Sequence, residues 1–166
     1  KDLAPVDRRE AAPPGLGDQQ CRGLAIDQVD DHGVRSEAFQ RQGQLDEAES
    51  CCRHAMRLSP WSAKAIYELG AVLQSAGRVE EAIAAYRQTI ELDPSHAEAH
   101  NNLGNALGAL GDRRAAIDCY HIAIGAKPDY AGAFNNLGVA LAAEGLPSEA
   151  IASYEQALRI TPQFAE

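Results

Sequence analysis

Residues 97–128 read AEAHNNLGNALGALGDRRAAIDCYHIAIGAKP. The proline that ends this stretch belongs to a series spaced by 34 residues, formed by Pro60, Pro94, Pro128 and Pro162. A fixed period of this length is typical of stacked supersecondary units, and it says more about the fold than any single residue does. Arrays of this kind usually bind other molecules through their extended surfaces.

Other residues keep the same period. The recurring positions are Gly43, Gly77, Gly111 and Gly145, then Ala48, Ala82, Ala116 and Ala150, then Cys52, Tyr86, Tyr120 and Tyr154. They divide the chain into four blocks, 29–62, 63–96, 97–130 and 131–164. Apolar residues recur at helical spacing on both sides of the glycine, as in Leu69, Val72 and Leu73, then Ile83, Tyr86 and Ile90. The sequence therefore predicts an all-α solenoid of four helix–turn–helix units.

The recurring glycine and proline predict where the helices end. A glycine such as Gly77 takes positive φ without strain and ends the first helix of its block. Proline keeps the residue before it out of the helical region, so we expect helices to end at Asp93, Lys127 and Thr161. Pro147 fits the first turn of a helix, where proline is tolerated.

Three further predictions concern caps and packing. Ser95 with Glu98 fits a capping box at the start of a helix. Gly70 and Ala82 are expected to face each other, so that two helix axes approach closely. Trp61 lies between two blocks and is expected to fill their junction.

The pattern resembles the tetratricopeptide repeat. The pairs that carry the resemblance are Leu69-Gly70, Leu103-Gly104 and Leu137-Gly138, followed later in the block by residues such as Ala150, Tyr154, Ala157 and Pro162. The resemblance covers residues 29–164 and implies a right-handed superhelix whose first helices line a concave groove. The first block departs from the pattern, with Arg35-Ser36 at the Leu-Gly position and Glu49 where the other blocks carry isoleucine.

The resemblance also implies a set of groove residues. By position they are Lys64, Tyr67, Gln74, Glu98, Asn101, Asn102, Asn105, Asn135, Asn136 and Val139. Asn102 and Asn136 stand one repeat apart, so stacking would align their amides in a ladder that holds a peptide backbone. This is similar to the asparagine ladder of O-linked N-acetylglucosamine transferases. The alternative is that these amides bond only to neighbouring helices or to water.

The two ends of the chain carry separate expectations. Residues 1–28 contain several prolines and glycines and are expected to form a loosely ordered leader. Residues 165–166 match the opening of a fifth block, so the chain looks like a piece of a longer array. A last repeat without a following helix would expose Ile151, Tyr154 and Leu158, and we expect homo-oligomers to form there.

Composition restricts the other partners. A net charge of −9 and a pI near 5.0 argue against nucleic-acid binding, because an acidic chain repels phosphates. No apolar run is long enough for a membrane span. The cysteines, which are Cys21, Cys51, Cys52 and Cys119, form no C-x-x-C pair and are typical of buried thiols in a reducing compartment. We therefore expect a cytoplasmic protein.

Catalytic chemistry has little support in the sequence. His96 and His100 are four residues apart but lack a third ligand, so we expect neither a metal nor a cofactor. No nucleophile–base arrangement or phosphate loop is visible, and the chain itself is not expected to be an enzyme. The favoured function is a module that presents its groove to an extended peptide or a partner helix. The alternatives are the substrate-recruiting region of a larger enzyme, such as a glycosyltransferase, and a self-assembling scaffold.

Overall fold

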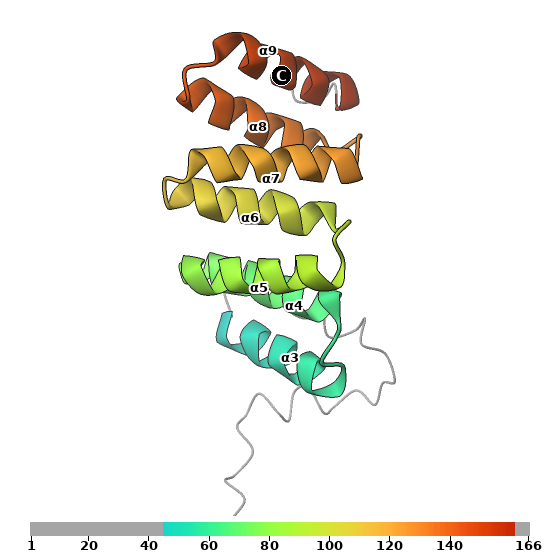
Figure 1. Cartoon of the computed structure of the whole chain (residues 1–166). Coiled ribbons are helices and arrows are strands. Elements are labelled where there is room, and N and C mark those ends of the chain that lie inside the picture. Colours follow the sequence, from blue (N-terminus) through green and yellow to red (C-terminus); the bar gives the residue numbers. More distant parts are fainter. Residues whose placement is uncertain (1–44, 162–166) are drawn as a thin grey trace, which may run out of the picture.

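The computed structural model describes residues 45–161 and contains seven helices in that range (Figure 1). They are α3 (Leu45–Leu58), α4 (Ala63–Ser75), α5 (Val79–Leu92), α6 (Ala97–Ala109), α7 (Arg113–Ala126), α8 (Ala131–Ala143) and α9 (Pro147–Ile160). The described part of the chain holds no strand, in agreement with the all-α prediction. The expected leader, the first helix of block 29–62 and residues 162–166 lie outside the described residues.

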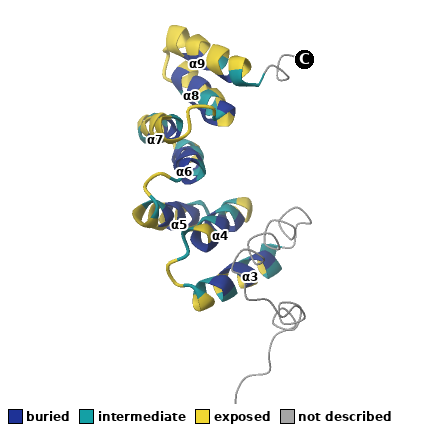
Figure 2. Cartoon of the chain, turned by 90° about the vertical axis from the view of Figure 1, so that its right-hand side faces the viewer, coloured by how far each residue is buried: buried dark blue, intermediate teal, exposed yellow. Residues whose placement is uncertain are grey.

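The helices stack in sequence order as a solenoid. Three antiparallel hairpins, α4–α5, α6–α7 and α8–α9, follow one another, and α3 packs on α4 as the second helix of the first block (Figure 1). Neighbouring first helices touch each other, α4 with α6 and α6 with α8, whereas the second helices α5, α7 and α9 make no contact among themselves. Figure 2 shows α5 and α7 on one side of the stack and α4 and α6 on the other. The stack therefore bends toward the first helices, and we call the surface of α4, α6 and α8 the inner face.

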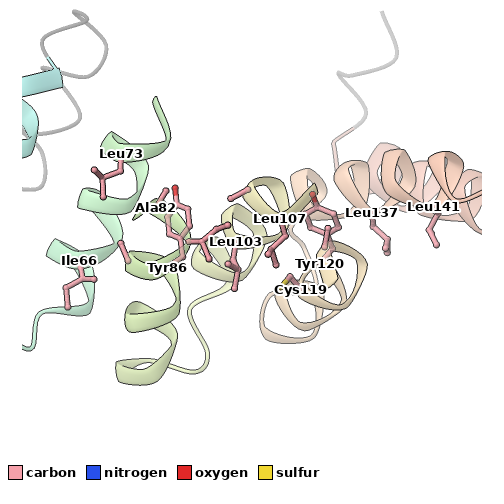
Figure 3. Close-up of a cluster of buried hydrophobic side chains, with 14 of the residues drawn as sticks. Ile66, Leu73, Ala82, Tyr86, Leu103, Leu107, Cys119, Tyr120, Leu137 and Leu141 are labelled. Atoms are coloured by element: carbon pink, nitrogen blue, oxygen red, sulfur yellow. The ribbon is translucent and has the colours of Figure 1, made fainter. Parts of the chain in front are cut away.

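One apolar core runs from α4 to α9. Figure 3 shows how Ile66 and Leu73 lead through Tyr86 and Leu103 to the following repeats. Tyr86 is completely buried, and its counterpart Tyr120 is buried in the next hairpin. Each repeat buries one face against its neighbour, so the core is continuous although no single repeat encloses it.

The recurrence of glycine in the Leu-Gly pair has a direct packing cause. A Cβ atom added to Gly104 would lie 2.6 Å from Cε1 of Tyr120, and one added to Gly138 would lie 2.5 Å from Cε1 of Tyr154. At Gly70 the nearest side chains are those of Tyr86 and Ala85. The prediction that Gly70 faces Ala82 was therefore wrong, because the ring of the same hairpin's tyrosine occupies the space over the glycine.

The glycine turns are confirmed. Gly77, Gly111 and Gly145 have φ values of 76°, 90° and 79°. The Asp112 amide donates to the Leu107 carbonyl at 3.0 Å and the Gly111 amide to the Gly108 carbonyl at 3.0 Å, which is the Schellman arrangement. The same two bonds recur after α4 and α8, so one turn geometry joins all three hairpins.

Gly111→Ala is expected to lower the free energy of unfolding by about 1–2 kcal/mol, because a residue with a Cβ atom is strained at positive φ. No atom lies within 4 Å of the added Cβ position, so the loss comes from the backbone alone. Urea unfolding followed by circular dichroism measures it. Gly111→Asn is the control and should lose clearly less, because asparagine tolerates this conformation. Equal losses for the two variants would contradict this explanation.

The proline boundaries are also confirmed. Asp93, Lys127 and Thr161 follow their helices with ψ values of 89°, 90° and 84°, outside the helical region. Pro147 is the first residue of α9, as expected.

Two local predictions were wrong. The N-cap of α6 is His96, whose Nδ1 accepts from the Ala99 amide at 3.2 Å. Ser95 instead donates hydrogen bonds from its amide and its hydroxyl to Asp93 Oδ1, at 3.1 and 2.7 Å. Its side chain is therefore bonded within the turn that precedes α6 and does not cap the helix. Trp61 is 79% exposed and fills no junction, because it lies in the short turn between α3 and α4.

Glu49 stands at the position where the other three repeats carry isoleucine, and it has an electrostatic role in the structure. Its carboxylate accepts from Arg78 Nη1 at 2.8 and 3.0 Å and pairs with Arg53 at 2.6 Å. Arg78 also binds Glu81 at 2.6 Å, and this hydrogen bond lowers the pKa of Glu81. An ion-pair network therefore joins α3 to Arg78, the N-cap residue of α5.

Candidate peptide-binding groove

A chain of amide side chains crosses the inner face. Asn136 Nδ2 on α8 donates to Asn101 Oδ1 on α6 at 2.9 Å. Asn101 Nδ2 donates to Asn102 Oδ1 at 3.2 Å, and Asn102 Nδ2 donates to the Tyr67 hydroxyl oxygen on α4 at 3.1 Å. We call Tyr67, Asn101, Asn102 and Asn136 the amide ladder. It links three successive first helices through polar contacts.

The ladder differs in one respect from the sequence expectation. Asn102 and Asn136 are joined through Asn101, a residue that is 5% exposed, rather than directly. Asn102 and Asn136 are half-buried. Each bond between neighbouring repeats stabilises the stack by about 0.5–1.5 kcal/mol, the usual net value of a hydrogen bond. Alanine at either position would therefore change stability as well as any binding.

Tyr67 anchors the ladder at its α4 end. Its ring lies 4.8 Å from the His96 ring and 6.0 Å from the Tyr86 ring, measured between centroids. Burial, followed by the neighbouring carboxylate of Glu68, raises the pKa of Tyr67 to about 12. The phenol thus stays protonated at neutral pH, and its oxygen can accept the Asn102 amide.

The remaining predicted groove residues fall into two groups. Some are held by other side chains: Glu98 accepts from Lys127 at 2.9 Å, Gln74 accepts from the Tyr86 hydroxyl at 2.7 Å, and Asn105 accepts from the Tyr120 hydroxyl at 2.9 Å. The Lys127 contact lowers the pKa of Glu98. Lys64, Asn135 and Val139 are exposed.

A cavity of about 240 Å³ opens on the inner face between α6, α7 and α8. It is lined by Asn105, Gly108, Arg113, Ala116, Tyr120, Asn136, Val139, Ala140 and Ala143. Three of the predicted groove residues, Asn105, Asn136 and Val139, come together here. Arg113 was missed by sequence reasoning, because it begins a second helix and only first helices were considered. The sequence signal that could have identified Arg113 is its position two residues after the turn glycine Gly111.

A second cavity, of about 390 Å³, lies between α8 and α9. Its lining includes Asn135, Tyr154 and Leu158, so two of the three predicted self-association residues contribute to it. The third, Ile151, is 58% exposed but does not line the cavity. One repeat earlier the matching surface of α6 and α7 is covered by α8, and the counterparts Asn101 and Tyr120 are buried.

The comparisons with known proteins address the family directly. Two models described as tetratricopeptide repeat match residues 33–60 and 101–163, and a third, described as TPR repeat, matches residues 75–111. The chain belongs to the tetratricopeptide repeat family. Repeats of this family are typically non-catalytic modules for protein interaction, and the family matches support a protein-interaction module in general for this chain. No curated protein matches its sequence.

Solved tetratricopeptide repeat structures have the same fold. A crystal structure of MamA is 26% identical, with a TM-score of 0.72 over 82% of this chain and 80% of MamA. PilF from Pseudomonas aeruginosa is 24% identical, with a TM-score of 0.76 over 81% of this chain and 61% of PilF. A mutant O-GlcNAc transferase from Thermobaculum terrenum is 28% identical, with a TM-score of 0.73 over 79% of this chain but 26% of the transferase.

In the described part of this tetratricopeptide repeat protein, two histidines have hydrogen-bonding roles and three cysteines are buried. His96 caps α6, and the buried His100 places Nε2 3.0 Å from the Pro94 carbonyl oxygen. Within residues 45–161 no three His, Cys, Asp or Glu side chains are grouped as metal ligands would be. Cys51, Cys52 and Cys119 are buried and free of disulfides, whereas Cys21 lies outside the described residues. None of the helices in 45–161 has the length and apolar character needed to cross a membrane.

The stability of the repeat stack is expected to fall between about pH 10 and pH 12. Burial raises the pKa of Tyr67 and of Tyr120 from 10.0 to about 12. The unfolded chain then loses these protons at lower pH than the folded chain. The tyrosines therefore contribute fully to the free energy of unfolding below about pH 10, and this contribution declines at higher pH. Urea midpoints measured from about pH 9 to pH 12 test this linkage. In Tyr120→Phe the decline should be shallower, and an identical pH profile would contradict the role of Tyr120.

Proposed function

We propose that this tetratricopeptide repeat array binds an extended peptide segment of a partner protein along its inner face. The cavity between α6, α7 and α8 carries the proposal, because an exposed apolar side chain, Val139, lines it together with the half-buried amides Asn105 and Asn136. Amides both donate and accept hydrogen bonds, so they suit the alternating N–H and C=O groups of a peptide backbone.

Preorganisation favours binding at this surface. The walls are helices whose contacts with neighbouring repeats are already made. Asn136 is held by its bond to Asn101, and Asn105 is held by the Tyr120 hydroxyl. A peptide that binds there immobilises few additional protein groups, so less of the contact free energy is lost to ordering.

The experiment uses capped twelve-residue peptides selected from a random displayed library against the whole chain. Affinity is measured by fluorescence anisotropy for the unaltered chain and for two variants. Val139→Arg places a long charged side chain at the cavity wall. Ile122→Arg is the matched control, because Ile122 is similarly exposed on α7 and lines neither cavity.

We expect Val139→Arg to weaken binding by at least about tenfold, which is 1.4 kcal/mol, and Ile122→Arg by less than about twofold. Equal affinities for both variants, or a larger loss in Ile122→Arg, would contradict binding at the inner face.

The structural similarity to an O-GlcNAc transferase keeps an enzyme context as the alternative. In that setting the same groove would recruit a polypeptide substrate for a catalytic domain elsewhere in a longer protein. Sequencing the transcript from its start codon to its stop codon separates the two. A catalytic domain in the same reading frame would favour the substrate-recruiting role, and its absence would favour a free-standing interaction module.

Self-association is a second candidate function, favoured by the cavity between α8 and α9. We propose that a helix from a second copy occupies it, in the way that α8 occupies the corresponding surface of α6 and α7. Sedimentation velocity over a wide concentration range should show reversible dimers or chains. Leu158→Glu should abolish them, and Leu146→Glu should not, because Leu146 is equally exposed but outside the cavity. A monomer at every concentration would exclude this candidate.

A further inference from the structure

The cavity between α6, α7 and α8 has an unusual lining for an acidic protein. Its polar members are Asn105, Asn136, Tyr120 and Arg113, and no carboxylate lines it. Asn105 accepts from Tyr120 through Oδ1, so its Nδ2 group can donate to another acceptor. The cavity therefore offers an amide donor and a guanidinium against a wall of small apolar side chains.

One lining residue of the cavity, Gly108, departs from the repeat pattern. One repeat earlier, Gln74 stands at the position of Gly108 and accepts from the Tyr86 hydroxyl at 2.7 Å. Gly108 has no side chain, so its volume is empty and Asn105 accepts the tyrosine hydroxyl instead, at 2.9 Å. A Cβ atom added to Gly108 would meet Ala116 Cβ at 3.7 Å, an ordinary contact, so close packing does not require glycine here.

The charge in the cavity comes from a second departure. Arg113 replaces the counterpart of Val79 at the first position of its helix. Its Nη1 lies 3.9 Å from Glu144 Oε1, which is too long for a hydrogen bond, and both side chains are about half exposed. Arg113 and Glu144 thus form a long ion pair without a hydrogen bond, and the guanidinium can still donate hydrogen bonds to a ligand that approaches along the inner face.

We infer that this cavity is a specificity subsite for an acidic side chain, Asp or Glu, of the bound peptide, with Arg113 as the cation and Asn105 as a neutral donor. The inference rests on the proposed function. Guanidinium and carboxylate form paired, charge-assisted hydrogen bonds, which a neutral amide side chain cannot replace. The chain has a net charge of −9, so a run of acidic residues is repelled, and the fitting peptide carries one acidic residue among neutral ones.

The first experiment is an NMR titration of the ¹⁵N-labelled chain with N-acetyl-glutamate N-methylamide, which has a side-chain carboxylate and capped ends. Saturable shifts are expected at the Arg113 Nε–H and Asn105 Nδ2–H₂ signals. N-acetyl-glutamine N-methylamide should bind at least about tenfold more weakly, as the loss of a charge-assisted bond predicts. N-acetyl-alanine carries a carboxylate at its C-terminus instead of on a side chain. It tests whether the cavity binds a chain terminus, and it should also bind more weakly than the glutamate compound.

Two variants restore the residues of the preceding repeat. Gly108→Gln fills the cavity and Arg113→Val removes the cation, and both side chains are already accommodated at these positions in the α4–α5 hairpin. Arg114→Val is the matched control, because it changes the net charge equally and Arg114 does not line the cavity. The shifts at Asn105 should disappear in the first two variants and persist in the third.

Equal binding of the glutamate and glutamine compounds, tighter binding of N-acetyl-alanine, or loss of the shifts in Arg114→Val would each overturn the inference. The peptide experiment with Val139→Arg is independent of these outcomes. If peptides bind the inner face but ignore Arg113→Val and Gly108→Gln, the acidic subsite is wrong and the proposed function stands. If no peptide depends on Val139, the proposed function itself fails.

Discussion

Tyr86→Ala is expected to lower the free energy of unfolding by about 3–5 kcal/mol, the usual cost of truncating a fully buried aromatic side chain. The Tyr86 side chain is completely inaccessible and covers Gly70. Its hydroxyl donates to Gln74 at 2.7 Å. Alanine would leave a cavity between α4 and α5, at the centre of the stack. Urea or thermal unfolding of the variant measures the loss.

Two controls separate the contributions. Tyr86→Phe keeps the ring and removes the hydroxyl, so it should cost only about 0.5–1.5 kcal/mol, the net value of one hydrogen bond. Tyr154→Ala removes the same residue type from the same column in α9, where the ring is only half-buried, and should cost clearly less than Tyr86→Ala. Similar losses at the two tyrosines would mean that burial does not determine how much the tyrosine at this repeat position stabilises the fold.

Gly104→Ala is expected to cost about 1–3 kcal/mol, as overpacking of a close contact usually does. The added Cβ atom would lie 2.6 Å from Cε1 and 3.0 Å from Cδ1 of Tyr120, which is closer than carbon atoms approach one another. Either the tyrosine ring must move or the two helix axes must separate. Both changes weaken the packing of α6 against α7 and disturb the Tyr120 hydroxyl that bonds Asn105.

Gly125→Ala is the matched control for this prediction. Gly125 lies in α7, has ordinary helical φ, and has no atom within 4 Å of an added Cβ. Alanine there should raise stability by up to about 1 kcal/mol, because it has a higher helix propensity than glycine. If Gly104→Ala were as stabilising as Gly125→Ala, the contact with Tyr120 would not explain the recurring glycine.

Features that every repeat shares were predictable from the sequence. The positive φ values at Gly77 and Gly111 follow from the chemistry of glycine. The glycines recur at a fixed spacing, so the turn predicted in one repeat is supported by the same residue in the next. The helix ends before Pro94 and Pro128 have the same origin.

Features that belong to one position were not predictable in this way. Ser95 could cap a helix or bond within its own turn, and only the local backbone decides which. Trp61 shows that a large apolar residue near a junction need not be buried. Predicting the cavity beside Gly108 would have required knowing which side chain the Tyr120 hydroxyl contacts. Gly108 has no side chain to fill this space, and Asn105 accepts the hydroxyl.

The amide ladder connects the stability of the stack to its proposed function. The contacts from Asn136 to Asn101 and from Asn102 to Tyr67 hold successive first helices in register. Asn101 is buried, but Tyr67, Asn102 and Asn136 are only half-buried, so side chains that stabilise the repeats are also partly accessible on the inner face. Exposed positions such as Val139 therefore test binding more cleanly than the ladder residues do.

Hydrogen–deuterium exchange of the chain with and without a selected capped peptide tests the central claim most directly. The account predicts that the peptide slows amide exchange in α6 and α8, with the largest change around Asn105 and Val139. Exchange in α5 and on the exposed side of α7 should be unchanged. Protection confined to α5 and α7, with none in α6 and α8, would contradict peptide binding at the inner face.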